Sequence, residues 1–388
     1  MNAFFRFART LCTGALICIG LVVLLANAAS AAPSGSMPAP AAKYNYYVSP
    51  DGSNSNPGTE SSPFQTIQHA ASVAVPGTTV HVGKGTYAGG FRTTISGEAN
   101  ARITYVSTVR WGAKIVPPVK SATHTAWDNR GSHVDIVGFD VDGRGSITGM
   151  PWLHGIYNGG SYVSIRNNQV QHIATRSGCG GAGASGIGVD SYYKGVNSDV
   201  IGNSVHDVGT PGCKYTKGIY LNTTGRIQNN VVYAIGGAGI QLWHDANRAT
   251  ISNNTVVAST SGILVGGGDY YHTKGPNDYT RVHNNIVFDN KFGITEHGWT
   301  GKNNTYRNNL VFQNPLADWA LRNGLKHTGT ISQAPQFVSY GKPNAVPDLR
   351  LLPSSPGIGK GISAQTPPVD INGKARKIAR YDVGAFQR

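Results

Sequence analysis

The chain has 388 residues and a formal net charge of +14 at pH 7, because 33 Lys and Arg residues outnumber 19 Asp and Glu residues. This length is ample for one large core. A basic protein attracts nucleic acid or an acidic polysaccharide, although an excess of Lys and Arg also keeps a protein soluble. The sequence has no nucleic-acid-binding motif, so we exclude nucleic acid and expect an acidic polysaccharide as partner.

The N-terminal residues have the pattern of a secretory signal. Residues 1–31 contain Arg6 and Arg9, then an apolar stretch, then small residues suited to cleavage, and without them the net charge is +12. We expect a secreted protein, extracellular or periplasmic, with no membrane association after cleavage; an uncleaved anchor is the alternative. Residues 32–42, rich in Pro, Ala, Ser and Gly, predict a disordered spacer before one domain over 43–388.

The two ends of this domain resemble known β-helix proteins. The N-terminal motif residues are Tyr47, Val48, Ser49, Pro50, Asp51, Gly52, Asn56, Pro57, Gly58, Thr59, Pro63, Phe64, Thr66, Ile67, Pro76, Gly77, Thr79, Val80, Val82, Gly85, Thr86 and Tyr87. This run resembles the beginning of secreted polysaccharide lyases of the family 9 type, and the resemblance implies a small helix that caps the first coil. Residues 347–385 look like the closing segment of many right-handed β-helix proteins.

The middle of the chain repeats two motifs in phase. A Gly-Ile step is followed, after a variable loop, by an Asn that stands two residues before an apolar residue. The Gly-Ile steps begin at Gly155, Gly186, Gly218, Gly239, Gly262 and Gly293, and the matching Asn residues are Asn168, Asn203, Asn230, Asn254, Asn285 and Asn309. A base period in the low twenties, lengthened by insertions, is typical of a solenoid. We therefore predict an all-β fold, a single right-handed parallel β-helix of roughly ten coils with a short N-terminal capping helix.

Asn suits the turn of such a coil for two reasons. It tolerates the left-handed backbone of a sharp turn, and its amide can hydrogen-bond to the Asn of the next coil and so form a ladder. Short strands such as 163–165, 187–189 and 219–221 supply alternating apolar side chains that point inward. A β-sandwich and a leucine-rich repeat are the alternatives. A sandwich has no reason to keep the two motifs in phase, and Leu is not the periodic residue.

Two cysteines follow the signal segment, Cys179 and Cys213. They precede consecutive Gly-Ile steps by seven and five residues, so they lie in equivalent loops of adjacent coils. Coils stack about 4.8 Å apart, a separation that a disulfide accepts. Because an exported protein meets oxidising conditions, we predict a disulfide between them.

The resemblance to family 9 lyases does not extend to their catalytic pattern. Those lyases carry acidic calcium ligands beside a Gly-Phe or Gly-Ile step, and a catalytic Lys after the Gly-Phe step of a later coil. Here Gly237, Ala238 and Gln241 occupy the places of the acidic ligands, and Leu264 occupies the place of the Lys. We therefore expect no catalytic calcium, no other metal and no cofactor.

One outward face of the predicted helix carries aromatic and polar side chains. When the Ile of each Gly-Ile step points inward, the next residue and the one two positions later point outward. Sugar rings stack on aromatic side chains and hydrogen-bond to amides, so this pattern is typical of a glycan groove. The candidate substrate-binding residues are Tyr157, Asp190, Asn222, Gln241 and Trp243, with Lys214 from a long loop that borders the face.

Cleavage of a uronic-acid glycan by β-elimination needs a base, a group that neutralises the carboxylate, and a proton donor. Lys217 is the predicted base, because burial or neighbouring positive charge lowers the pKa of a Lys. His244 or Lys214 would meet the carboxylate, and Tyr220 would protonate the departing oxygen. Asp245 would orient His244.

These features predict a secreted, monomeric lyase that acts on an acidic polysaccharide. The alternative is a non-catalytic carbohydrate-binding or structural β-helix protein. Two other enzyme classes are less favoured. Polygalacturonase-type hydrolases use an adjacent Asp pair and alginate epimerases carry Asp-Pro-His-Asp, and neither motif occurs in the chain.

Overall fold

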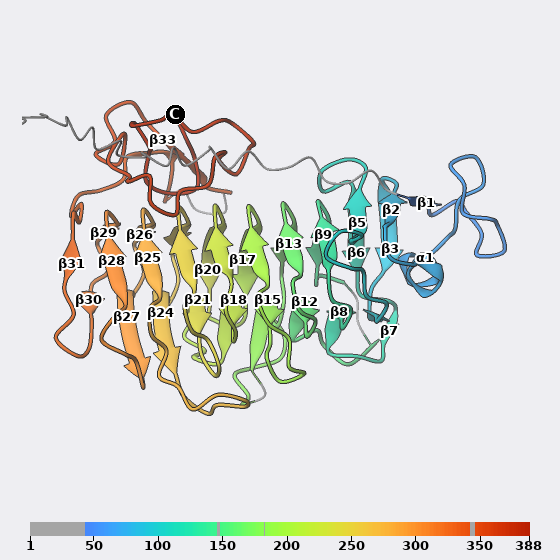
Figure 1. Ribbon diagram of the computed structural model, residues 1–388, viewed down its shortest axis with the longest axis horizontal. Coiled ribbons are helices and arrows are strands. Elements are labelled where there is room, and N and C mark those ends of the chain that lie inside the picture. The colour runs from blue at the N-terminus through green and yellow to red at the C-terminus, as the bar shows by residue number, and fades with distance from the viewer. Residues whose placement is uncertain (1–42, 146–147, 182, 342–345) are drawn as a thin grey trace, which may run out of the picture. The chain divides into compact units, whose positions relative to one another are not determined.

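The computed structural model describes residues 43–388 except 146–147, 182 and 342–345. Within them the chain forms a parallel β-helix built from three stacked parallel sheets (Figure 1). The predicted all-β fold with parallel pairing between coils is therefore confirmed. The predicted signal peptide, residues 1–31, and the predicted spacer, residues 32–42, lie outside the described residues.

The three sheets run along the length of the helix. The eleven strands of the first sheet are, in spatial order, β1 (Tyr44–Val48), β2 (Thr78–Val82), β5 (Ile103–Ser107), β9 (Val134–Val137), β13 (Ser164–Arg166), β16 (Asp199–Ile201), β19 (Arg226–Gln228), β22 (Thr250–Ser252), β25 (Arg281–His283), β28 (Thr305–Arg307) and β31 (His327–Thr328). The nine strands of the second are β3 (Gly85–Ala88), β6 (Ala113–Val116), β10 (Asp140–Asp142), β14 (Gln169–Gln171), β17 (Ser204–Val208), β20 (Val231–Ile235), β23 (Thr255–Val257), β26 (Ile286–Phe288) and β29 (Leu310–Phe312). The nine strands of the third are β4 (Phe91–Thr93), β8 (Thr125–Asn129), β12 (His154–Asn158), β15 (Ala184–Val189), β18 (Thr216–Leu221), β21 (Ala238–Leu242), β24 (Ser261–Gly267), β27 (Phe292–Gly298) and β30 (Ala317–Ala320). Along the chain, β13, β14 and β15 belong to the first, second and third sheets in turn, and β16 returns to the first.

The Gly-Ile steps lie in the third sheet and have a steric explanation. Ile219 is fully buried and pairs in register with Ile187 on one side and Ile240 on the other. A Cβ at Gly218 would lie 2.6 Å from the carbonyl oxygen of Gly239 and 2.7 Å from a Val methyl of the second sheet. The position therefore accepts only a residue without a side chain, because the core around it is closely packed.

The repeated Asn residues form the predicted ladder. From Asn168 through Asn203, Asn230, Asn254 and Asn285 to Asn309, each Nδ2 donates to the next Oδ1, at 3.1, 3.0, 2.9, 2.9 and 2.9 Å. The expected left-handed backbone belongs to a different residue, which corrects the prediction. The residue before each ladder Asn has the positive φ, for example Asn229 at 57° and Gly202 at 69°. The ladder Asn itself is buried, where its amide satisfies backbone groups that water cannot reach.

The C-terminal segment covers the outer face of the second sheet. It contains an antiparallel pair, β32 (Phe337–Ser339) and β33 (Asp348–Leu351), and lies along the C-terminal part of the helix (Figure 1). Its apolar side chains, including Leu349 and Val383, form one cluster with outward residues of the second sheet such as Ile286 and Phe288. A further short parallel pair joins β7 (Lys120–Ser121) to β11 (Thr148–Gly149).

One short helix, α1 (Ile67–Val73), lies at the N-terminal end of the described residues (Figure 1). The Thr66 side chain caps it by accepting a hydrogen bond from the His69 backbone N–H at 3.2 Å. Ile67, Ala70 and Ala71 are buried, and the helix packs against β1, β2 and β4. Over the part of the chain that the structure describes, no helix has the length and apolar character needed to cross a membrane.

Candidate functional site

The third sheet presents two rows of outward residues, which form the floor of an open cleft of about 780 Å³. Backbone pairing aligns Tyr157, Gly188, Tyr220 and Gln241 in one row. Of the nine residues predicted for catalysis or binding, eight line this cleft: Lys217, Tyr220, His244, Tyr157, Asp190, Gln241, Trp243 and Lys214.

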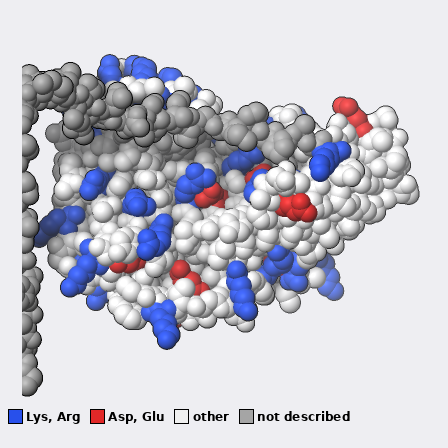
Figure 2. Space-filling model, in the orientation of Figure 1, with Lys and Arg blue, Asp and Glu red and all other residues white. Residues whose placement is uncertain are grey.

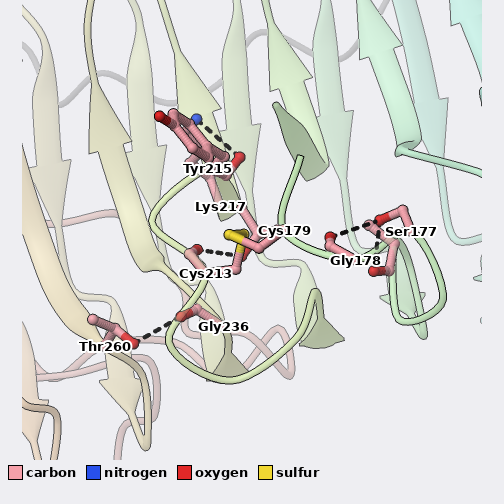
Figure 3. The surroundings of a disulfide bond; sticks show 10 residues. Ser177, Gly178, Cys179, Cys213, Tyr215, Lys217, Gly236 and Thr260 are labelled. Carbon is pink, nitrogen blue, oxygen red and sulfur yellow. Dashed lines mark hydrogen bonds between the residues drawn. A yellow bond between two sulfur atoms is a disulfide. The ribbon is translucent and has the colours of Figure 1, made fainter. Parts of the chain in front are cut away.

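Lys217 is buried at the floor of the cleft, with 8% of its surface exposed. Its Nζ donates to the carbonyl oxygen of Tyr215 at 3.1 Å (Figure 3). The same Nζ lies 4.8 Å from the centroid of the Tyr220 ring. Burial lowers the pKa of Lys217 to about 8. At pH 7 a significant fraction of Lys217 is therefore the neutral amine, whereas an exposed Lys is almost entirely protonated.

Two tyrosines in the same row keep their protons. Burial, with the negative charge of Asp190 as a second cause, raises the pKa of both Tyr157 and Tyr220 well above the usual Tyr range. The Tyr157 hydroxyl donates to Oδ2 of Asp190 at 2.7 Å. Tyr220 is therefore a protonated hydroxyl beside a buried amine, which can donate a hydrogen bond or a proton.

Asn222 is the predicted binding residue that does not line the cleft. It is fully buried, and its Nδ2 donates to Oδ1 of Asp190 at 3.3 Å. The backbone N–H of Tyr192 donates to the same oxygen at 3.0 Å. Asn222 thus helps to hold the Asp190 carboxylate from beneath the cleft floor.

His244 is held by its neighbours on a loop rather than by Asp245, which corrects the prediction. Its Nδ1 donates to the carbonyl oxygen of Asp269 at 2.7 Å, and its Nε2 lies 2.9 Å from the Tyr271 hydroxyl. The His244 and Tyr271 rings stack with centroids 4.0 Å apart. Because a carbonyl only accepts, Nδ1 carries a proton, and Nε2 is the ring atom that pairs with the Tyr271 hydroxyl. Trp243 is fixed beside them by a 3.0 Å hydrogen bond from Nε1 to Oδ2 of Asp269.

Sequence reasoning missed two cleft residues next to Lys217. Backbone pairing aligns His154, Ser185 and Lys217 in the second outward row. The His154 Nδ1 hydrogen-bonds to Oγ of Ser185 at 2.9 Å, and burial lowers the pKa of His154 to about 4, so its ring is neutral at pH 7. Each of the three stands two residues before a buried Ile, where strict alternation predicts an inward side chain. The intervening Gly, whose Cβ position also faces the core, breaks the alternation, so strand periodicity alone does not find these residues.

The predicted disulfide is confirmed. Cys179 and Cys213 are bonded, with Cα atoms 5.3 Å apart and 34 residues of sequence separation. The bond lies beside Tyr215 and Lys217 and joins two loops next to the cleft (Figure 3). It therefore restrains the loop that supplies Lys214 and Tyr215.

The places where the resemblance would put acidic ligands hold no carboxylate. Ala238 is buried, and Gln241 lines the cleft. Over the described part of the chain, no group of three or more His, Cys, Asp and Glu side chains is arranged to hold a metal ion.

Two comparisons of the sequence with known proteins found partial matches. A family model described as "Protein of unknown function (DUF1565)" matches residues 50–95. The uncharacterized protein YwoF of Bacillus subtilis (strain 168) is 30% identical over 142 residues, which are 35% of this chain and 30% of that protein. The chain thus matches less than a third of that relative's length.

Three solved structures share the architecture. The pectate lyase Pel9A superimposes with a TM-score of 0.59 at 17% identity, over 89% of this chain and 96% of that one. A rhamnogalacturonan lyase superimposes with 0.51 at 17% identity, over 80% and 97%. XylC in complex with xylose superimposes with 0.51 at 15% identity, over 74% and 70%. The chain therefore shares the parallel β-helix architecture of these proteins, which confirms the predicted fold.

Proposed function

We propose that the protein is a secreted lyase that cleaves an acidic, uronic-acid-containing polysaccharide by β-elimination in the cleft on the third sheet. The observation that carries the proposal is a buried Lys217, whose pKa is lowered to about 8, beside the protonated Tyr220 on the cleft floor. An amine of this pKa is close to the optimum for a general base at neutral pH. By their names, two structural neighbours are lyases of pectate and rhamnogalacturonan, which supports this reaction class.

In the proposed reaction Lys217 removes the ring proton next to the uronate carboxylate. The electron pair left on carbon forms a double bond as the neighbouring carbon–oxygen bond breaks, and Tyr220 gives its proton to the departing oxygen. About a tenth of Lys217 is neutral at pH 7, which is enough for catalysis. Lys214 or His244 would neutralise the carboxylate and so favour loss of the adjacent proton.

The substrate would be bound by the remaining cleft residues. Tyr157 and Trp243 supply aromatic surface, and Gln241 and Asp190 supply polar groups for sugar hydroxyls. The net charge of +12 without residues 1–31 favours an anionic polysaccharide chain. Figure 2 shows Lys and Arg side chains spread over one face of the molecule, with fewer Asp and Glu among them.

Several further features belong to the same proposal. The confirmed disulfide fits an exported protein, because such bonds persist in oxidising compartments. We also propose that the protein acts as a monomer, that α1 caps the first coil, and that the helix has roughly ten coils.

The experiment is a screen of the secreted form against uronic-acid polymers, including polygalacturonate and alginate, with ultraviolet absorbance of the unsaturated product as the readout. We expect the wild type to generate this product, and Lys217→Met to lose at least a hundredfold in rate. The matched control is Lys302→Met at an exposed Lys outside the cleft, which should retain the wild-type rate.

Each other outcome identifies a different function. New reducing ends without unsaturation would mean hydrolysis, and an altered uronate without new ends would mean epimerisation. Binding without any chemical change would favour a carbohydrate-binding protein. Full activity in Lys217→Met would show that the site is wrong even if the reaction class is right.

A further inference from the structure

Asp245 is a buried carboxylate whose hydrogen bonds come from two different loops. Its Oδ2 accepts from Oγ of Ser191 at 2.7 Å, and its Oδ1 accepts from Oγ1 of Thr273 at 2.8 Å. The backbone N–H groups of His272 and Thr273 also donate to Oδ1, at 3.1 and 2.9 Å. Among the described residues, no Lys, Arg or His forms an ion pair with Asp245, so these donors alone satisfy the charge.

These bonds join loops that leave strands three coils apart, β15 and β24, with β18 and β21 between them. Ser191 follows β15, Asp245 follows β21, and β18 lies between those strands in the sheet. Thr273 belongs to the long loop after β24. A second link between the loops is the hydrogen bond from Nε2 of His272 to the carbonyl oxygen of Tyr192, at 3.2 Å. The loops after β15 and β24 are therefore fixed relative to each other by the Asp245 carboxylate and by this second hydrogen bond.

The linked loops carry three exposed tyrosines, of which Tyr192 contacts the other two. Tyr192, Tyr193 and Tyr271 are 58%, 52% and 39% exposed. Tyr192 meets Tyr193 and Tyr271 in edge-to-face pairs, with ring centroids 5.0 and 5.3 Å apart. We call these three side chains the tyrosine platform. Contiguous aromatic surface left open to water costs free energy and marks a binding surface.

The tyrosine platform is continuous with the cleft. Tyr271 lines the cleft and stacks on His244, and Tyr193 meets the ring of Tyr157 on the cleft floor edge-on, at 6.5 Å. The Arg130 guanidinium lies over the Tyr193 ring at 3.5 Å and over the Tyr157 ring at 4.9 Å, so it helps to fix both. A polymer bound in the cleft would therefore pass onto the platform.

We propose that the tyrosine platform is a sugar-stacking subsite of the cleft, and that Asp245 is the positioning residue that holds it. The occupant is a pyranose ring of the same polysaccharide chain, because the C–H face of a sugar packs on aromatic rings while its hydroxyls remain in water. The inference rests on the proposed function in one respect, namely that the cleft binds a glycan. It does not depend on elimination.

The test is a binding measurement on the Lys217→Met background, so that no polymer is consumed. Calorimetry with polygalacturonate and alginate should show that Tyr192→Ala and Tyr271→Ala each weaken affinity about tenfold, whereas the Phe variants, which keep the ring, stay within about twofold. Tyr44→Ala is the matched control, because Tyr44 is 50% exposed on β1, which pairs in the first sheet. Wild-type affinity in both Ala variants would overturn the platform and leave the proposed function standing.

Failure of the proposed function gives a different result. If the wild type binds polymer without cleaving it and the Ala variants weaken that binding, the platform stands and the lyase proposal fails. If the wild type binds no uronic-acid polymer, both fail.

The positioning role of Asp245 is tested by asking whether the effects of Asp245→Leu and Tyr271→Ala on binding affinity are additive. Asp245→Leu removes both carboxylate oxygens that accept hydrogen bonds at the junction and should weaken binding about as much as Tyr271→Ala. Because both changes disrupt one platform, the double variant should bind about as well as either single variant. Additive losses, or lowered thermal stability with unchanged affinity, would overturn the positioning role.

Discussion

The Nζ atom of Lys217 lies 4.8 Å from the centroid of the Tyr220 ring, and no described Asp or Glu forms an ion pair with it. A buried ammonium without a carboxylate partner is costly, so burial alone shifts the pKa of this side chain downward. The same placement suits Lys217 to the role of base in the proposed reaction, and it makes the folded protein less stable while the side chain is charged.

The first prediction concerns the pH dependence of cleavage. A base must be deprotonated to act, and the pKa of Lys217 is about 8, so the initial rate should rise about tenfold per pH unit from pH 6 toward pH 8 and level off above it. Initial rates on the polymer that the screen identifies provide the measurement. Lys217→Arg should lose at least a hundredfold, because Arg stays protonated. A rate that is flat or falling between pH 6 and 8 would contradict the assignment.

The second prediction concerns stability. The pKa of Lys217 is about 8 in the folded protein against the usual 10.5 of a Lys side chain. The unfolded state therefore binds more protons between these values, and stability rises with pH across that window. Below pH 8 the charged side chain costs on the order of 3 kcal/mol. Lys217→Met should therefore raise the free energy of unfolding at pH 7, and the gain should shrink toward pH 10.5. Denaturant titrations at several pH values measure it, and Lys302→Met should show no such trend.

The fold could be predicted because backbone constraints recur in every coil. Gly218 has no space for a Cβ, and Asn230 pairs with its equivalents in the coils on either side. Both constraints repeat along the chain and are therefore visible in one sequence. The prediction placed the left-handed backbone at the ladder Asn, whereas the residue before it has the positive φ. The two positions are hard to tell apart in the sequence because Asn often occupies both, as at Asn229 and Asn230.

The cleft floor could be predicted in part, and the loops above it could not. Strand alternation placed Tyr157 and Tyr220 on one face, because the period of a strand is two. The partners of His244 and Asp245 depend on the conformation of the loop after β24, which has no periodicity. For that reason the sequence led to a wrong link between His244 and Asp245, and gave no sign that Asp245 joins two loops.

The third prediction concerns the Asn ladder. Asn230 donates from Nδ2 to the Val200 carbonyl oxygen and to Asn254, and its Oδ1 accepts from Asn203. Asn230→Ala leaves these buried groups without partners and should lower the free energy of unfolding by about 2–4 kcal/mol. Chemical denaturation measures this change. Asn100→Ala, at an exposed position, is the control, and an equal effect of both would show that the ladder contributes nothing specific.

The fourth prediction concerns the disulfide. The bond closes a loop with a sequence separation of 34 residues. Removing it through the paired change Cys179→Ser and Cys213→Ser should lower stability by about 3–4 kcal/mol, because the unfolded chain regains loop entropy. Thermal unfolding of the double variant measures the loss. Free thiols at both positions of the unreduced wild type, found by mass spectrometry after alkylation, would contradict the bond itself.

The carboxylates of the cleft are already engaged by the protein. Asp190 accepts hydrogen bonds from Tyr157 and Asn222, and Asp269 accepts from Trp243. Calcium takes six to eight oxygen ligands, usually including several carboxylates, so a tight site would have to break these contacts.

The fifth prediction is therefore that chelation leaves activity intact. Gly237, Ala238 and Gln241 supply no carboxylate at the places where acidic ligands were considered, and Ala238 pairs in register with Lys217. After dialysis against a chelator, the initial rate on the identified polymer should stay within about twofold of the untreated rate. Unfolding temperatures with and without calcium serve as the control, because an ion that only stabilises the fold would change them without changing the rate at low temperature. Activity that disappears with chelator and returns only with calcium would show that a metal site forms with the substrate, whose own carboxylates would then complete the ligand set.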